Sequence, residues 1–192
     1  MPVTAWSVQS RRRANEELRA ALETMFFGAA AITRALLPHM RERRSGTIVQ
    51  LTSVGGLITA PGFGAYCAAK HALEALSESL AAEVAAFGVR VLIVEPGAFR
   101  TRLFGSAFRS LPALDAYAAT VGATRAYATQ SEGQQAGDPA KAARAIADAV
   151  DAGAPSLRLP LGADAVQSIR AKLARVTADV DQTESVAVAT TF

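Results

Sequence analysis

Apolar residues recur at helical spacing over a long stretch near the start of the chain. They lie three or four residues apart, which predicts an amphipathic helix over about residues 15–43. Pro38 is expected to kink the last turns of this helix, and Gly46 to end it. Residues 1–14 show no clear period and are predicted to form a loose N-terminal arm. The apolar positions of the predicted helix are Leu18, Leu22, Met25, Ala29, Ile32 and Leu36.

The next stretch alternates between strand-like and helix-like patterns. Residues 47–51 are few, β-branched and apolar, as expected of a strand covered on both faces. A loop rich in glycine and proline follows over residues 54–64, and helical spacing returns over residues 65–87. Residues 89–94 form a second apolar, β-branched run. Strand, helix and strand in this order, with a crossover of this length, predict a parallel βαβ unit and an α/β fold.

The rest of the chain is predicted to be irregular before it becomes helical again. Residues 98–137 fit a mobile segment with one or two helices. Asp138 and Pro139 suit the N-cap and first turn of a helix that stops at Gly153. The tail, residues 181–192, has few core-forming residues and is expected to fray. A helix, a short strand and an amphipathic helix are thus predicted over residues 138–151, 157–159 and 164–178.

Composition narrows the possible classes of protein. The chain has 192 residues, of which 51% are hydrophobic and 19% charged, which is typical of one globular domain. Its formal net charge of +3 is not gathered into a basic stripe, so a nucleic-acid surface is not expected. No apolar run approaches the roughly 20 residues that span a bilayer, and no signal-peptide pattern opens the chain. With Cys67 as its single cysteine, the chain is expected in the reducing cytoplasm.

Three polar residues near the end of the first predicted strand form a candidate proton-transfer set. Tyr66 and Lys70 are four residues apart at the start of a helix, so their side chains share one face. A free phenol has a pKa of about 10, and a nearby cation and the positive end of the helix dipole are both expected to lower it. Ser53 lies just past the strand, where α/β folds place functional groups. Each piece alone also fits an exposed helix pair or a turn serine, but together they suit a general acid/base.

These residues lie in segments that resemble the short-chain dehydrogenase/reductase family. The family's serine strand and loop look like GTIVQLTSVGG at residues 46–56, and its catalytic motif matches YCAAK at residues 66–70. The segment after its next strand matches VEPGAFRT at residues 94–101. The resemblance covers about residues 15–180 and implies a Rossmann-like, doubly wound parallel sheet with flanking helices.

The resemblance also implies roles for individual residues. Tyr66 would be the catalytic acid/base, Lys70 would assist it and bind the nicotinamide ribose, and Ser53 would be both catalytic and substrate-binding, holding the carbonyl. The segment after the second strand would contact the nicotinamide, with Thr101 and the backbone at Phe99 near its carboxamide. The cofactor would be NAD or NADP, and the substrate a small carbonyl or alcohol. The implied cofactor-binding residues are Tyr66, Lys70, Pro96, Gly97, Phe99 and Thr101.

Two departures from the family pattern stand out. The Gly-rich turn that approaches dinucleotide phosphates, T-G-x-x-x-G-x-G, has no counterpart, since no glycine precedes Gly28. The chain is therefore expected to form only the C-terminal half of the sheet, to leave an open apolar edge on the strand at residues 47–51, and to bind dinucleotides weakly or not at all. Met25 also stands where the family usually has an asparagine of its proton relay, and a thioether cannot replace an amide.

Other reactive side chains are assigned no catalytic role. His71 is expected at the surface or an interface, His39 to be structural, and Cys67 to pack in the core. No spacing of His, Cys, Asp and Glu suggests a metal site.

Two hypotheses of different class remain. The first is an NAD(P)-dependent oxidoreductase with Tyr66 as acid/base, whose substrate pocket, partly apolar, would be shaped by residues 100–135. The second is a truncated, non-catalytic remnant that associates through the helices at about residues 15–43 and 65–87, which form the dimer contact in the family. A homo-oligomer is expected from either. The sequence identifies neither the substrate nor the choice between NAD and NADP.

Overall fold

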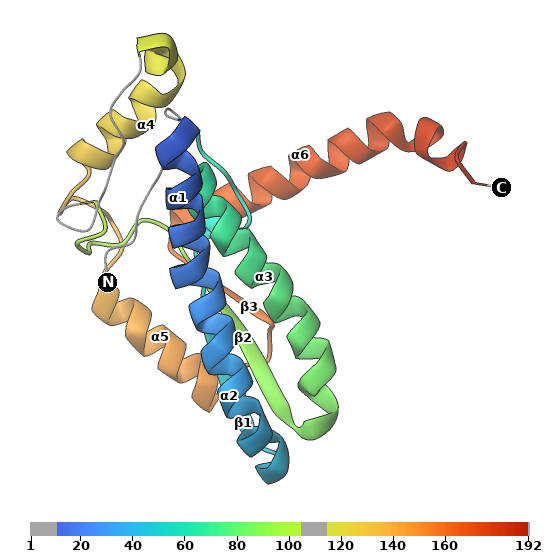
Figure 1. Cartoon of the computed structure of the whole chain (residues 1–192). Helices are drawn as coiled ribbons and strands as arrows, with labels where there is room; N and C mark the ends of the chain where they lie inside the picture. The colour runs from blue at the N-terminus through green and yellow to red at the C-terminus, as the bar shows by residue number, and fades with distance from the viewer. Residues whose placement is uncertain (1–10, 105–114, 192) are drawn as a thin grey trace.

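The protein has a three-stranded parallel sheet flanked by helices, which confirms the predicted α/β fold and its partial Rossmann-like character (Figure 1). The computed structural model describes residues 11–104 and 115–191. Strand order is β1-β2-β3, and both pairings are parallel. The predicted third strand at residues 157–159 is present, with its bounds shifted toward the C-terminus. The strands are β1 (Gly46–Leu51), β2 (Val89–Pro96) and β3 (Arg158–Leu161).

The first predicted helix is a chain of three helical segments that run end to end beside α3 (Figure 1). It begins at Arg11, so part of the predicted loose arm is helical, while residues 1–10 of that arm lie outside the described residues. A five-residue π-helix interrupts it, which means that one residue more than an α-helix needs is wound into that turn. The segments are α1 (Arg11–Leu22), η1 (Glu23–Phe27) and α2 (Gly28–Arg43).

The end of α2 is closed by a residue that the sequence did not single out. Pro38 lies inside α2, and the helix continues to Arg43. Arg44 then takes the left-handed conformation, with φ 51°, before Gly46 is reached. Its carbonyl oxygen faces Gly88, where an added Cβ would lie 2.6 Å away, and Gly88 itself has φ 68°. Glycine is therefore required at position 88 for both its conformation and its close approach to Arg44.

The crossover from β1 to β2 carries the main core. It consists of η2 (Val54–Gly56), α3 (Gly64–Val84) and a last 3-10 turn, η3 (Ala85–Phe87), which confirms the helix predicted at residues 65–87. One face of α3 packs on the sheet through aliphatic side chains that exclude water. The buried members of this cluster are Ile48, Leu80, Val84, Val89, Val91 and Ile93.

Strand β1 is covered on one face only, so the prediction of a strand covered on both faces was wrong. Ile48 and Gln50 are buried, and the Gln50 amide donates a 2.9 Å hydrogen bond to the Thr33 hydroxyl on α2. Val49 and Leu51 point to the opposite face and are 38% and 58% exposed. The sequence predicted an open apolar edge on this strand. In agreement, no described strand pairs with the outer edge of β1. Burial alternates along β1 because helices cover only the face of the strand that is turned toward α2 and α3.

After β2 the described chain is mostly helical. Asp138 caps α5 as predicted, because its Oδ1 accepts hydrogen bonds from the backbone N–H groups of Ala140 and Lys141 at 2.8 and 3.3 Å. The last helix runs ten residues further than the predicted end at Ala178, so residues up to Val188 of the expected frayed tail are helical. The elements are η4 (Asp115–Tyr117), α4 (Ala118–Gln130), α5 (Pro139–Asp151) and α6 (Ala163–Val188).

One helical stretch corrects the expectation that no segment is long and apolar enough to span a bilayer. The helix over Asn15–Arg43 meets that criterion by length and composition, because alanines and large apolar residues dilute its charges. Only 17% of its most apolar window is buried in the structure. A single helix of this kind, near the N-terminus, is also found among core helices of soluble proteins and among signal sequences, so it assigns no membrane location by itself.

Candidate active site

Ser53 lies at the carboxyl end of β1, where its hydroxyl is fixed by the backbone around it. The residue is extended and serves as the N-cap of η2. Its Oγ accepts a 3.0 Å hydrogen bond from the N–H of Gly55 and donates to the carbonyl oxygen of Pro96, 3.5 Å away at the end of β2. Because β1 and β2 are parallel, both strands deliver these groups to the same edge of the sheet.

Tyr66 lies in the first turn of α3 and packs directly over this loop. A Cβ at Gly55 would lie 2.8 Å from Cε1 of the Tyr66 ring, so only glycine permits this approach. Burial raises the pKa of the Tyr66 phenol, a hydrogen bond with the Ser53 side chain lowers it, and the charge of Cys67 raises it further. The net direction is upward, which is opposite to the lowered pKa expected from the sequence. Removal from water therefore outweighs the stabilisation of the phenolate in this chain.

Lys70 lies one turn further along α3 and connects that helix to β1. Its Nζ donates a 2.9 Å hydrogen bond to the carbonyl oxygen of Leu51, the last residue of the strand, and lies 5.9 Å from the centre of the Tyr66 ring. Burial lowers the pKa of Lys70 to about 8, against an opposing effect of Glu74. The ammonium thus lies over the tyrosine ring, as the four-residue spacing predicted. Its hydrogen bond goes to the Leu51 carbonyl oxygen of β1 and not to the phenol oxygen.

An ionic cluster, in which Glu74 and Glu95 are buried and Glu78 is exposed, adjoins the site, and the sequence reasoning missed it. The Arg158 guanidinium on β3 pairs with three carboxylates, those of Glu74 and Glu78 on α3 and of Glu95 on β2. Glu74 also accepts a hydrogen bond from the Thr52 hydroxyl, which lies 2.9 Å from the carbonyl oxygen of Val94 as well. The four-residue spacing of Lys70, Glu74 and Glu78, together with a glutamate inside an apolar strand, was the available signal.

Glu74 also packs against the loop that carries Ser53. A Cβ at Gly56 would lie 2.7 Å from Cγ of Glu74, so the carboxylate side chain and the loop are in direct contact. Burial raises the pKa of Glu95; Arg158 lowers it through hydrogen bonding and charge, and Glu74 raises it. The net direction for the pKa of Glu95 is upward, so burial and the nearby charge of Glu74 outweigh its pairing with Arg158.

The segment after β2 contains the other predicted cofactor-binding residues. The Gly97 N–H donates to the Leu161 carbonyl at 2.9 Å, and a Cβ at this position would collide with the Asp164 carboxylate. Phe99 forms an isolated parallel bridge with Gly137. Thr101 is exposed, and its hydroxyl accepts the N–H of Leu103 at 3.3 Å. Of this predicted set, Pro96 is the residue that contacts Ser53.

A row of aromatic rings leads away from the phenol. Phe63 packs edge-on against Tyr66 and against Phe104, with ring centres 6.3 Å apart in both pairs. Phe104 packs in the same way against Tyr127 on α4, at 6.0 Å. The row is an apolar wall beside Tyr66, which agrees with the partly apolar pocket predicted over residues 100–135, although residues 105–114 of that range lie outside the described part.

The residue in the place of the family's asparagine is part of an apolar contact with Tyr66. Met25 lies in the π-helix η1 and is buried with Ala21 and Ala69, against which the Tyr66 side chain packs. Its thioether offers no amide to relay a proton. Cys67 is buried as predicted, and its carbonyl accepts a 2.8 Å hydrogen bond from Nδ1 of His71.

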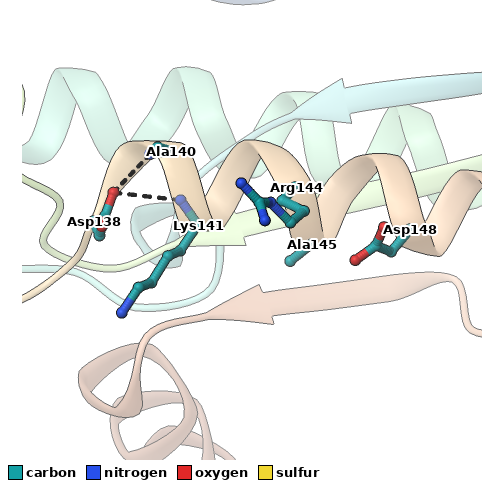
Figure 2. A pocket seen from close by; sticks show the side chains of 6 residues that line it. All are labelled: Asp138, Ala140, Lys141, Arg144, Ala145 and Asp148. Carbon is teal, nitrogen blue, oxygen red and sulfur yellow. Dashed lines mark hydrogen bonds between the residues drawn. The ribbon is translucent and has the colours of Figure 1, made fainter.

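One surface depression is separate from this arrangement. A surface depression of about 390 Å³ runs along α5, and Figure 2 shows that charged side chains of Asp138, Lys141, Arg144 and Asp148 line it. It shares no residue with the candidate site. Within residues 11–104 and 115–191, no group of three or more His, Cys, Asp and Glu side chains could hold a metal ion.

Comparison with known proteins assigns the family. The family model described as short chain dehydrogenase matches residues 4–112, more than half of the chain. The chain belongs to the short-chain dehydrogenase family. This confirms the resemblance found in the sequence, and the match begins closer to the N-terminus than residue 15.

Known members of the family to which this chain is similar are longer than the chain. Oxidoreductase BOA17 of Botryotinia fuckeliana is 38% identical over 79% of the chain and 56% of its own length. The uncharacterized oxidoreductase YusZ of Bacillus subtilis is 34% identical over 77% of the chain and 54% of its own length. The chain therefore spans about half the length of these curated relatives.

Solved structures support the same assignment. A crystal structure of a short-chain dehydrogenase from Streptomyces avermitilis is 52% identical, with a TM-score of 0.85 over 92% of the chain and 64% of the solved chain. A short chain dehydrogenase from Burkholderia cenocepacia, solved in complex with NADP, has a TM-score of 0.69 at 20% identity, which supports the fold.

Proposed function

We propose that this chain carries the proton-transfer part of an NAD(P)-dependent oxidoreductase that interconverts a carbonyl and an alcohol. The observation that supports the proposal best is the convergence of Ser53, Tyr66 and Lys70 at one edge of the sheet. The hydroxyl comes from the turn after β1, where Ser53 caps η2, and the phenol and ammonium come from the first turns of α3, which pack against η2. The names of the relatives, which are oxidoreductases and dehydrogenases, agree with this chemistry.

In the proposed reaction, Tyr66 moves the proton. In the reductive direction the neutral phenol donates its proton to the oxygen that develops negative charge, and in the oxidative direction the phenolate removes a proton from the alcohol. Because its pKa is raised, the phenol is protonated near neutral pH, so the proton needed in the reductive direction is in place. The Ser53 side chain, which is hydrogen-bonded to the phenol, would hold the substrate oxygen within reach of that proton.

Lys70 would stabilise the charge that develops on the phenol. Its ammonium lies over the Tyr66 ring, and the hydrogen bond to Leu51 limits the directions in which it can move. A pKa of about 8 leaves this amine protonated below that pH and neutral above it. The proposed reaction should therefore depend on pH in the range where Lys70 loses its charge.

The residues at this edge suit one end of a dinucleotide better than the other. Lys70 and the backbone of the Pro96–Thr101 segment would hold the ribose and the nicotinamide, which when bound would supply or accept the hydride. The described glycine loop is not free to bind phosphates, because the N–H groups of Gly55 and Gly56 already donate to Ser53 at 3.0 and 2.8 Å. We therefore expect this chain alone to bind NADH or NADPH more weakly than micromolar, which a fluorescence titration would measure.

The decisive experiment compares Tyr66→Phe with the unaltered chain in an assay of NADPH and NADH oxidation at saturating cofactor, against a panel of carbonyl compounds. Loss of the phenol should lower the rate by about 100-fold or more. Tyr117→Phe is the matched control, since it removes a hydroxyl from an exposed tyrosine outside the site. Equal rates for Tyr66→Phe and the unaltered chain would overturn the catalytic proposal.

A second candidate function, association without catalysis, rests on a separate observation. Phe27, Ile32 and Leu36 project large apolar side chains into solvent from η1 and α2, beside α3. Such a surface is typical of a helix-mediated contact between subunits, and we propose a cytoplasmic homo-oligomer that uses it. Ile32→Asp should reduce the mass measured by light scattering, whereas Ser45→Asp, in the exposed turn after α2, should not. A monomeric unaltered chain would exclude this candidate.

A further inference from the structure

The last helix, α6, extends away from the rest of the molecule and is exposed along most of its length (Figure 1). Its first turns contact β3 and η2, and Ala165 there is fully buried. Beyond Lys172 every described side chain of the helix is exposed. Isolated helices in water are marginally stable, and most helical stability in proteins comes from packing an apolar face. The distal part of α6 therefore lacks, within the described chain, the contact that normally stabilises such a helix.

The large apolar residues of α6 from Val166 to Val180 follow a seven-residue pattern, whereas Val186 and Val188 near its end lie off it. The residues of the pattern are spaced alternately three and four residues apart, which places them on one narrow stripe of the kind that pairs helices as a coiled coil. Val166 and Ile169 are half-buried near the body, while Leu173, Val176 and Val180 are 58%, 41% and 58% exposed. The pattern continues with smaller residues at the end of the helix. We call this stripe the α6 seam; its members are Val166, Ile169, Leu173, Val176, Val180, Thr183 and Ala187.

Charged residues divide α6 into a basic part and an acidic part. The basic part comes first, and Arg170 and Lys172 flank the seam there. The acidic part follows, and Asp179 and Glu184 flank the seam there. Within residues 11–104 and 115–191, none of these four side chains forms an ion pair.

We propose that the α6 seam binds the α6 seam of a second copy of this chain in antiparallel orientation. An antiparallel pair places the basic part of each helix beside the acidic part of the other, whereas a parallel pair would place like charges together. The register that buries most apolar surface sets Leu173 against Val176 of the second copy and Ile169 against Val180. In this register Lys172 lies near Asp179 of the other helix, twice by symmetry.

This inference is independent of the proposed catalysis and of the contact proposed through α2. Its surface is a different helix, and its measurements need neither cofactor nor substrate. A membrane surface or an unrelated protein could also cover an apolar stripe, but neither would reproduce the reciprocal charge pattern, and the experiments below separate them.

The first experiment measures the self-association of the full chain by sedimentation equilibrium. Leu173→Glu should weaken the association constant by about 30-fold or more, as expected for a buried contact at the centre of an interface. Ala174→Glu adds the same charge one residue away, off the seam, and should leave the constant within about threefold. Equal effects of both variants, or no self-association that depends on Leu173, would overturn the proposal.

The second experiment tests orientation by disulfide trapping, which is possible because the native Cys67 is buried. A mixture of Leu173→Cys and Val176→Cys chains should form the mixed disulfide, and each variant alone should form little. A parallel pair would give the reverse, with each variant linking to itself. No cross-link in either arm would overturn the proposal together with the orientation.

The third experiment is a charge exchange, which a merely structural role of either residue would not reproduce. Lys172→Asp and Asp179→Lys should each weaken self-association several-fold, and the double variant should recover it. Arg175→Asp, a charge reversal off the flanks of the seam, is the control. Failure of the double variant to recover would exclude the proposed register.

Discussion

Strands β1 and β2 are neighbours of similar composition, yet they occupy different environments. β2 pairs with a strand on each edge and is buried on both faces, from Val91 to Glu95 without a break. β1 pairs with β2 alone among the described strands, and its residues alternate between buried and exposed. The candidate site joins the two, since Ser53 follows β1 and Pro96 ends β2. One half of the site thus rests on a fully supported strand and the other on an edge strand.

The contacts that hold the candidate site in place therefore come mainly from β2 and the elements packed against it. Glu95 on β2 and Arg158 on β3 belong to the ionic cluster, which reaches the Ser53 loop through Glu74. On the β1 side, the corresponding links are the hydrogen bonds of Lys70 to Leu51 and of Gln50 to Thr33. Perturbations of the β2 side should therefore cost more stability than equal perturbations of β1.

The largest effect is expected when the shared cation is removed. Arg158→Met would leave Glu74 and Glu95 buried without a counter-charge, and breaking a buried pair in this way costs about 3–5 kcal/mol of unfolding free energy. Urea denaturation measures this loss. Arg144→Met, an exposed arginine on α5, should change stability by less than about 0.5 kcal/mol. A small effect of Arg158→Met would mean that the cluster does not support the β2 side.

The next effect compares the strands directly. Ile93→Ala on β2 should cost about 2–4 kcal/mol, because Ile93 is fully buried in the core cluster. Val49→Ala on β1 should cost less than about 1 kcal/mol, since its side chain faces solvent. The same denaturation experiment reports both values. Similar losses would show that β1 is covered in solution by a contact beyond the described residues.

A smaller effect, dependent on pH, is expected from Glu95→Gln. The pKa of Glu95 is raised in the folded chain, so its contribution to stability is present below the ordinary glutamate pKa of about 4.3 and is lost as pH rises through the folded value. Glutamine does not ionise, so the variant should gain stability relative to the unaltered chain as pH increases from about 4. The groups facing this position are Glu74 and Arg158, which the variant retains. A difference that stays constant with pH would contradict the raised pKa.

The smallest effect concerns Lys70, the link from α3 to β1. Its amine should become reactive toward acylating reagents as pH rises through about 8, because burial lowers its pKa to that value. Mass spectrometry of short labelling pulses can follow this reaction, with the lysines Lys141 and Lys172 as internal references. Glu74 raises the pKa of Lys70, so Glu74→Gln should move the labelling profile toward lower pH. An unchanged profile would show that Glu74 does not act on this amine.

The sequence predicted most elements and the proximity of Ser53, Tyr66 and Lys70, because these depend on local patterns. Spacing of four residues placed Tyr66 and Lys70 together, and strand order placed Ser53 beside them. The direction of the Tyr66 pKa could not be predicted, since it depends on burial by Met25 and its neighbours from a distant helix. The ionic cluster was missed because Arg158 lies 84 positions from Glu74, a separation that no local pattern reports.

The extra residue in η1 determines the direction in which the side chains of α2 point around the helix axis. Each residue of an α-helix turns the chain by about 100°, so winding in one more residue rotates α2 by about that angle relative to the direction in which α1 points. With the π-helix in place, the Thr33 hydroxyl faces β1 and accepts a hydrogen bond from Gln50. Deleting one residue between Glu23 and Phe27 would straighten the helix locally and turn Thr33 away from the sheet, and the exposed row of Phe27, Ile32 and Leu36 would turn with it. The π-helical turn η1 therefore determines at once which side of α2 packs on the sheet and which side is exposed to solvent.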